Sequence, residues 1–260
     1  MEFNITNSDK CEQFIGIFQN IKSFSESINI SLNNEGLYLQ TMDGSNVSIF
    51  ELRLSHDWFD SYNITENITI GINSNIFQKV ISLWNKNLII KVDTPNKDYD
   101  KLNISLENRN IEKDFECSKY FEIPLIEIEN EILTIPDTEY TVDIDISGNK
   151  FKKIIDELSL MGDLIKFDCS EKNITAFTES HDGSMKLEIH IDEENESYCI
   201  EEGSEISCSF RLKYIKSISS IHKLSKLTSI HLSEDIPMLI KFDINEKSSV
   251  RFFLAPQIND

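Results

Sequence analysis

The sequence predicts an α+β protein made of two similar domains, each with antiparallel sheets and two helices. A strand–turn–strand segment, residues 36–54 (GLYLQTMDGSNVSIFELRL), returns in weaker form as residues 173–191 (NITAFTESHDGSMKLEIHI). Helices and strands also follow one another in the same order in both halves of the 260-residue chain. Self-similarity over so long a period indicates an internal duplication.

Each half begins with an amphipathic helix. In residues 9–24 and 148–162, apolar side chains recur at the spacing of one helical face. A β-branched strand and a polar turn follow, and then the duplicated hairpin, whose second arm alternates apolar and polar residues as a half-buried strand does. A second helix is expected at residues 73–86 and at residues 210–224, and each leads into a further strand.

The segment between the two copies, SKYFEIPLIEIENEILTIP, is rich in Glu and apolar residues and has no helical period. We interpret it as an extended connector. The expected organisation is a first domain at residues 1–117, a connector at 118–136 and a second domain at 137–260.

Composition excludes several classes of protein. The first ten residues lack the basic start and apolar run of a signal peptide, and no apolar run approaches the roughly 20 residues of a membrane span. We therefore expect a soluble, intracellular chain with no membrane partner. The five cysteines are scattered and form no CxxC pair, which predicts reduced thiols and neither a disulfide framework nor a metal site.

Charge is strongly segregated along the chain. The formal net charge is −20, which by itself opposes nucleic-acid binding. However, residues 67–92 and 206–233 contain no acid, and each stretch includes the expected second helix of a copy. Acids concentrate in residues 93–145, with fifteen acids against five bases, and in 192–205, with seven acids and no base. This pattern predicts one surface that tolerates phosphate and another that repels it.

Two other classes of function fit the sequence less well. An enzyme is disfavoured because the chain has no Gly-rich phosphate loop, no HExxH and no nucleophile elbow, and its five histidines are scattered. We therefore name no catalytic residue and no cofactor. An acidic protein that mimics DNA would spread its acids over a continuous face, and the acid-free helices oppose that reading.

Three segments together resemble the sliding clamps of the proliferating cell nuclear antigen (PCNA) type. Residues 36–59 resemble a signature of that family, residues 133–140 (LTIPDTEY) resemble the end of its interdomain connector, and DIPMLIKFDI with VRFFLAPQIND, near the C-terminus, resembles its last two strands. The resemblance runs in order over almost the whole chain. It implies a homotrimeric ring that encircles duplex DNA, with the helices lining the hole, and that acts as a processivity factor.

The resemblance also implies which side chains face DNA. Lys79, Lys153 and Lys213 match basic positions of the family, and Lys216 lies one turn beyond Lys213. Other positions where better-known members carry Lys or Arg hold different residues here: Gln13, Asn20, Asp156 and Ser220. These departures mark a diverged clamp, for which a viral origin is one interpretation, with a weaker positive lining.

Two further surfaces follow from the resemblance alone. A pocket for the clamp-binding motif of partner proteins would be formed by Met42, Asn46, Val47, Leu133, Ile135, Pro136, Pro237, Phe253, Leu254, Ala255 and Pro256. The ring would close between edge strands at residues 110–118 and 183–191, with Phe115, Cys117, Met185 and Leu187 at the subunit interface.

The implied partners are double-stranded DNA without sequence preference, a DNA polymerase and other proteins with clamp-binding motifs, and a clamp loader. The implied location is the nucleus, or a cytoplasmic replication site for a viral protein. A subunit of a heterotrimeric checkpoint-type clamp remains an open alternative, and the well-kept LTIP and LAP segments favour the replicative type.

Overall fold

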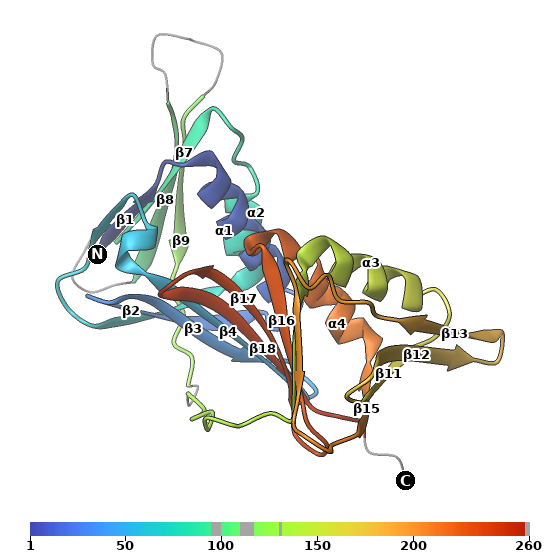
Figure 1. The fold of residues 1–260 in the computed structure, drawn as a ribbon. Helices are drawn as coiled ribbons and strands as arrows, with labels where there is room; N and C mark the ends of the chain where they lie inside the picture. Colours follow the sequence, from blue (N-terminus) through green and yellow to red (C-terminus); the bar gives the residue numbers. More distant parts are fainter. Residues whose placement is uncertain (95–99, 110–116, 130–131, 258–260) are drawn as a thin grey trace. The chain divides into compact units, whose positions relative to one another are not determined.

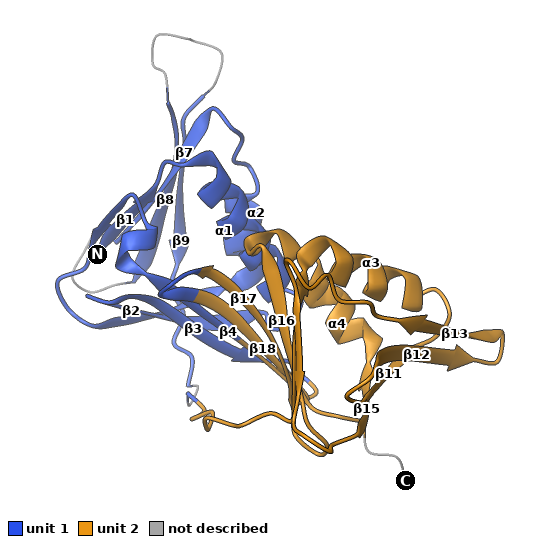
Figure 2. Ribbon diagram, viewed as in Figure 1, with its two compact units in different colours: residues 1–44, 51–132, 245–248 blue, residues 45–50, 133–244, 249–260 orange. Residues whose placement is uncertain are grey.

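A computed structural model describes residues 1–94, 100–109, 117–129 and 132–257. The chain divides into two compact units (Figure 2). Unit 1 comprises residues 1–44, 51–132 and 245–248, and unit 2 comprises residues 45–50, 133–244 and 249–260. No helix among the described residues is long and apolar enough to cross a membrane.

The described residues of unit 1 form two α-helices and a set of antiparallel strands (Figure 1). Its elements are β1 (Glu2–Ile5), α1 (Ser8–Ile21), β2 (Ser27–Asn33), β3 (Gly36–Met42), most of β4 (Ser48–Ser55), the short η1 (His56–Trp58), β5 (Ser61–Asn63), β6 (Ile68–Asn73), α2 (Ser74–Ile81), β7 (Leu88–Asp93), β8 (Lys101–Asn108) and β9 (Lys119–Pro124). The strands run in the orders β5-β1-β7-β8-β9 and β4-β3-β2-β6.

Unit 2 repeats this arrangement. Its elements are β10 (Val142–Ser147), α3 (Gly148–Leu158), β11 (Leu164–Cys169), β12 (Ile174–Ser180), β13 (Gly183–Glu188), β14 (Ser197–Ile200), β15 (Ile206–Arg211), α4 (Leu212–Ser219), η2 (His222–Leu224), β16 (Leu227–Leu232), β17 (Met238–Asn245) and β18 (Ser248–Leu254). The strands run in the orders β14-β10-β16-β17-β18 and β13-β12-β11-β15.

The duplication predicted from the sequence is confirmed by this topology. Each strand of unit 1 has a counterpart nine strands later in the chain, and both sheet orders are reproduced when the strands are renumbered in this way. The duplicated hairpins are β3–β4 and β12–β13, as the sequence predicts. Two copies of one folding unit therefore present two equivalent pairs of helices, α1 with α2 and α3 with α4.

The helices pack through the apolar stripes seen in the sequence. In unit 1, Phe18 bridges the two helices, with its ring centroid 4.7 Å from that of Phe14 on α1 and 4.7 Å from that of Phe77 on α2. All three rings are buried. In unit 2, α3 begins at Gly148, where a Cβ atom would lie 2.3 Å from the carbonyl oxygen of His222. The tight approach of α3 to η2 therefore requires glycine there.

The helices are shorter than the sequence predicts. α2 ends at Ile81 and α4 at Ser219, although apolar periodicity continues for several residues beyond each. The strand β9 is a second difference, because residues 119–124 were assigned to the connector from their composition. All six residues of β9 pair with β8, from Lys119 opposite Leu106 to Pro124 opposite Lys101.

Candidate nucleic-acid interface and partner pocket

Helix α2 presents a single charged side chain to solvent, that of Lys79. The helix begins where the side chain of Asn73 accepts a hydrogen bond from the backbone N–H of Ile76, at 3.0 Å. Phe77 and Ile81 are buried, which turns Lys79 outward. Among the described residues, no hydrogen bond or ion pair engages the Lys79 ammonium. Its charge is therefore available to a phosphate.

Helix α4 presents two such charges. Ile215 and Ile218 are fully buried, and Lys213 and Lys216 point to the exposed side. The Lys213 ammonium lies 4.6 Å from the centroid of the Tyr214 ring, a cation–π contact that leaves its positive charge in place. Within the part of the chain that the structure describes, neither lysine has an acidic partner, as expected from the acid-free stretch around them.

Helix α3 differs, because its acids lie one turn from its lysines. The Lys152 ammonium is 2.8 Å from a carboxylate oxygen of Asp156, and the Lys153 ammonium is 3.8 Å from a carboxylate oxygen of Glu157. Residues four apart lie on the same face of a helix, so both pairs are local. Lys153 matches a DNA-facing position of the clamp resemblance, and the structure gives it an acidic neighbour.

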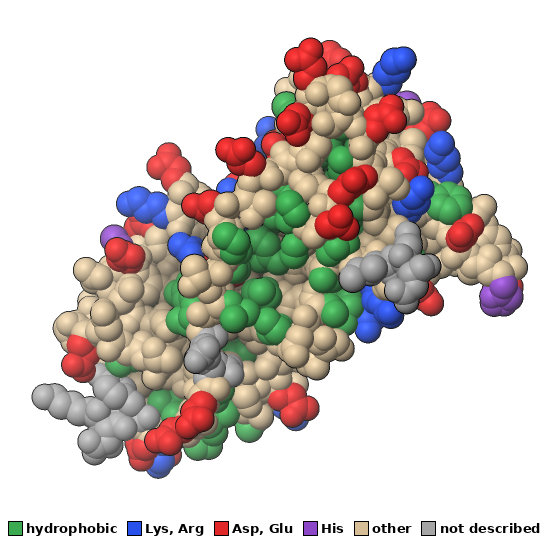
Figure 3. Space-filling model, turned by 90° about the horizontal axis from the view of Figure 1, so that it is seen from below, with side chains coloured by type: hydrophobic (Ala, Val, Ile, Leu, Met, Phe, Trp, Pro, Cys, Tyr) green, Lys and Arg blue, Asp and Glu red, His purple; other side chains and the backbone are tan. Residues whose placement is uncertain are grey.

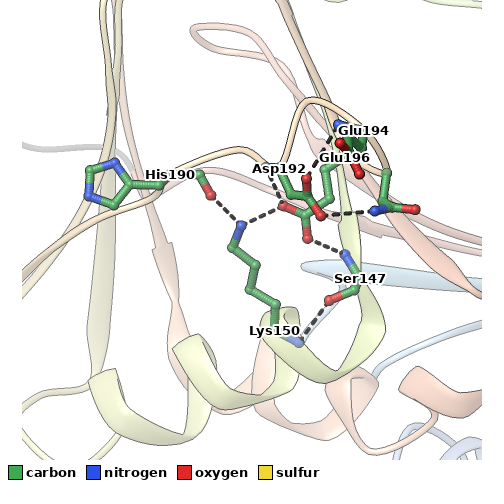
Figure 4. A network of polar contacts seen from close by, with 7 residues as sticks. Ser147, Lys150, His190, Asp192, Glu194 and Glu196 are labelled. Atoms are coloured by element: carbon green, nitrogen blue, oxygen red, sulfur yellow. Dashed lines mark hydrogen bonds and ion pairs between the residues drawn. The ribbon is translucent and has the colours of Figure 1, made fainter.

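The third lysine of α3 is bound into a network at the start of the helix (Figure 4). The Lys150 ammonium is 2.5 Å from a carboxylate oxygen of Glu196 and also donates to the carbonyl oxygen of His190. Glu196 further accepts the backbone N–H groups of Ser147, at 3.0 Å, and Asp192, at 3.1 Å. Its side chain is only 5% exposed.

This network sets the ionisation of Glu196. Burial by itself would raise the pKa of its carboxyl group, because the charged form loses hydration. The hydrogen bonds from Lys150, Ser147 and Asp192 outweigh burial, and the pKa lies below its ordinary value. Glu196 is therefore charged at neutral pH, and it holds the segment from His190 to Glu196 against the first turn of α3.

Helix α1 contributes little positive charge. The Lys10 ammonium is 3.3 Å from a carboxylate oxygen of Asp60, and Lys22, just after the helix, donates to the side chain of Gln78 at 3.1 Å. Asn20, where better-known clamps have a basic residue, is only 4% exposed. That position therefore faces the core of unit 1 in this chain.

The expected pocket residues of the C-terminal segment lie beside the β3–β4 turn. The backbone N–H of Ala255 donates to the carbonyl oxygen of Val47 at 2.9 Å. Phe253 and Leu254 are buried, whereas Ala255 is half-buried and accessible. Asn46 has φ of +57°, a left-handed conformation that Asn tolerates better than most residues.

The connector residues of the expected pocket are open to solvent. Leu133 is 41% exposed, Pro136 is exposed and Ile135 is half-buried. Met42, at the end of β3, is half-buried and belongs to unit 1. Hydrophobic side chains are visible on the face drawn in Figure 3, among Asp and Glu side chains.

Sequence reasoning missed one residue beside Pro237. The hydroxyl of Tyr140 donates to the carbonyl oxygen of Pro237 at 3.2 Å, and its ring lies 5.4 Å, centroid to centroid, from that of His231. His231 is in turn 2.5 Å from a carboxylate oxygen of Asp143. Burial raises the pKa of Tyr140, with nearby Arg251 acting in the opposite direction, so the phenol stays protonated. Tyr140 lay inside the LTIPDTEY segment, and its aromatic ring was the available signal.

The edge strand expected in the first domain cannot be compared with the structure over most of its length. Most of residues 110–118, Phe115 included, falls outside the described residues, and Cys117 is exposed and precedes the strand. Among the described residues, β9 is one of the two edge strands of that sheet, opposite β5, and its Tyr120 is 70% exposed. The sequence placed β9 in the connector because residues 118–136 are rich in Glu and apolar residues and have no helical period, which fits an extended linker and an edge strand equally well.

In unit 2, the outermost strand next to β12 is β13, as expected for one arm of the duplicated hairpin. Met185 and Leu187 are half-buried on one side of β13, and Lys186 and Glu188 are exposed on the other. A strand with one free backbone edge and half-buried apolar side chains needs a partner or protection.

Comparison with known proteins decides the family. A model of the N-terminal domain of proliferating cell nuclear antigen matches residues 9–132, and a model of its C-terminal domain matches residues 134–257. The chain belongs to the PCNA family. Proliferating cell nuclear antigen of Chaetomium thermophilum is 30% identical over 247 residues, which cover 92% of each chain.

Membership gives the two units their function. A PCNA-family protein is a sliding clamp and processivity factor in DNA replication. Clamps of this family are non-enzymatic scaffolds that form trimers. They bind DNA, polymerases and other clamp-binding proteins. The clamp resemblance drawn from the sequence is confirmed, as is the α+β duplicated fold. The matches of the two family models are separated only by residue 133. Leu133 is also the first of the connector residues expected in the pocket.

Proposed function

We propose that three copies of this chain close into a homotrimeric ring around duplex DNA, in which α2 and α4 face the phosphates. The observation that carries this proposal is the pairing pattern of the lysines. Lys79, Lys213 and Lys216 are exposed without acidic partners in the described structure, whereas the chain as a whole has a net charge of −20. Free lysines on two helices of an acidic protein provide a surface where phosphates can bind and release counterions.

Ring closure would join β9 of one copy to β13 of the next. Both strands are outermost in their sheets among the described residues, and each offers a row of backbone donors and acceptors. Head-to-tail pairing of two different edges generates a closed ring when the rotation is right. In this arrangement Tyr120, Met185 and Leu187 supply apolar contacts across the interface, and Cys117 lies beside it.

Partner proteins would dock at the surface formed by the connector, the β3–β4 turn and the C-terminal segment. Leu133, Ile135 and Ala255 offer accessible apolar groups, and the buried Phe253 and Leu254 hold the floor in place. Tyr140 fixes the Pro237 carbonyl at its border. We assign to this surface the clamp-binding motifs of a DNA polymerase and of other replication proteins, with an ATP-driven loader to open the ring.

Light scattering over a concentration series at moderate salt tests the ring. The expected native mass is three times 30.1 kDa. A persistent monomer contradicts self-closure and favours a heteromeric checkpoint-type clamp, which would form only when other subunits are added. Localisation of a tagged chain at replicating DNA distinguishes a nuclear site from a cytoplasmic one.

A further inference from the structure

The four helices differ in how much of their positive charge is free. On α3, each of three lysines has a carboxylate within 4.0 Å: Glu196 for Lys150, Asp156 for Lys152 and Glu157 for Lys153. On α4, Lys213 and Lys216 have no such partner in the described structure, and no acid occurs between residues 206 and 233. The two helices belong to one pair but differ in how much of their positive charge is compensated.

We propose that the electrostatic contact with duplex DNA is made by α4, assisted by Lys79 of α2, and that α3 contributes no net attraction. This inference rests on the proposed function, because it assigns the DNA contact to particular helices of the clamp. It differs from the expectation, drawn from the clamp resemblance, that Lys153 faces DNA as Lys213 does.

The ion pairs of α3 attract DNA weakly because both charges of a pair act on the same phosphate. At physiological salt the Debye length is about 8 Å, so a phosphate near the helix senses an ammonium and a carboxylate 4 Å apart as one nearly neutral group. On α3 the charges of Lys152 and Asp156 largely cancel in this way, as do those of Lys150 and Glu196. On α4 nothing opposes the two ammonium groups, and both can release counterions from DNA.

The three α3 lysines are not held equally. Lys150 is bound to a Glu196 side chain that is 5% exposed and is the most firmly engaged. Lys153 is 75% exposed and 3.8 Å from Glu157, so its pair is the loosest. Exposed pairs of this kind contribute about 0–1 kcal/mol. DNA can therefore compete for Lys153, but Glu157 remains nearby and repels the same phosphate.

The test measures binding of a fluorescent duplex oligonucleotide to the full chain by anisotropy, over a series of salt concentrations. The α4 variant is Lys213→Gln with Lys216→Gln. The α3 variant removes both ion pairs, by Lys152→Gln and Lys153→Gln together with Asp156→Asn and Glu157→Gln. Both remove two exposed or half-exposed lysines from a helix surface and leave the buried face intact. Light scattering on each variant establishes that the oligomeric state is unchanged.

We expect the α4 variant to weaken binding strongly. The slope of log affinity against log salt should become shallower by about 2 for each subunit that touches the duplex, from about 0.9 for each phosphate contact. The α3 variant should change the affinity less than twofold, because the charges that it removes cancel. The acid-neutralising variant Asp156→Asn with Glu157→Gln should raise the affinity several-fold, because it frees two lysines.

Equal losses in the α4 and α3 variants would overturn the inference, as would an acid-neutralising variant that binds no more tightly than the parent. In both cases the parent protein still binds duplex DNA, and the proposed function stands. If the parent protein binds no duplex even at low salt, the proposed function fails, and this inference fails with it.

Discussion

Glycine 71 fixes the approach of the connector to unit 1, and its replacement offers a sharp test. Gly71 lies on β6 opposite Asn29 of β2. Its carbonyl oxygen accepts the backbone N–H of Ile126 at 2.9 Å, and the Asn29 side-chain amide donates to the carbonyl of Ile128 at 3.0 Å. The first part of the connector is thus attached to the sheet by two hydrogen bonds.

A Cβ atom at position 71 would lie 2.1 Å from the carbonyl oxygen of Ile126. Ordinary contact begins at 3.4 Å, so the connector backbone would have to move away by about 1.3 Å. Gly71 is not among the residues with positive φ, which means that alanine meets no backbone strain there. The expected effect of Gly71→Ala is therefore displacement of the connector.

The magnitude follows from the two bonds that the displacement breaks. Each contributes about 0.5–1.5 kcal/mol, so the loss is about 1–3 kcal/mol. Replacing glycine in a strand returns about 0.5–1 kcal/mol through reduced entropy of the unfolded chain. We expect a net destabilisation of about 1–2 kcal/mol, most of it local to residues 125–128, together with weaker binding of a partner peptide.

Denaturant unfolding and amide hydrogen exchange measure the two effects. Protection of the Ile126 amide should fall in Gly71→Ala. The control is Gly16→Ala, because Gly16 lies within α1 and a Cβ there meets nothing within 4 Å. That variant should gain about 0.5–1 kcal/mol from helix propensity. Unchanged stability and an Ile126 amide that stays protected in Gly71→Ala would refute the reasoning.

Three further outcomes are expected. Cys169 and Cys208, whose thiol pKa values burial raises to about 12, should resist alkylation at pH 8 in the native protein, whereas exposed Cys199 reacts, as mass spectrometry would show. Glu196→Gln should lower the free energy of unfolding at pH 7. Because the folded-state pKa of Glu196 is depressed, the stability that its charge contributes is present above the ordinary pKa of about 4.5 and is lost as the pH falls through the folded value. The free energies of unfolding of parent and variant should therefore converge in acid. In the proposed ring, Leu187→Asp should convert trimer to monomer by placing a carboxylate in an apolar contact, and a variant that stays trimeric by light scattering would exclude β13 from the interface.

Much of the fold was predictable because its signals are local. Helical and strand periodicity repeat within a few residues, and the hairpin at 36–54 and its copy are visible as written. The pairs on α3 were also within reach of the sequence, since Lys152 and Asp156 are four residues apart in a predicted helix. The free lysines of α4 were predicted for the same reason, because no acid lies nearby in the chain.

The boundary of the connector was not predictable in this way. Residues 119–124 (KYFEIP) have no helical period, which fits an edge strand as well as an extended linker. Only their pairing with β8, which runs from Lys119 opposite Leu106 to Pro124 opposite Lys101, makes them a strand. The lengths of α2 and α4 were overestimated for a related reason. Apolar residues beyond Ile81 and Ser219 continue the spacing of the helical face, although the helices end there.

The sequence by itself therefore determined the duplicated α+β architecture, the segregation of charge and the family resemblance, all of which depend on the order of neighbouring residues. Tertiary structure decided which charges are free and what holds the connector. Lys150 and Glu196 are 46 residues apart, and Asn29 and Ile128 are 99 apart. Such contacts form only when the sheets bring distant segments together, and no local pattern records them.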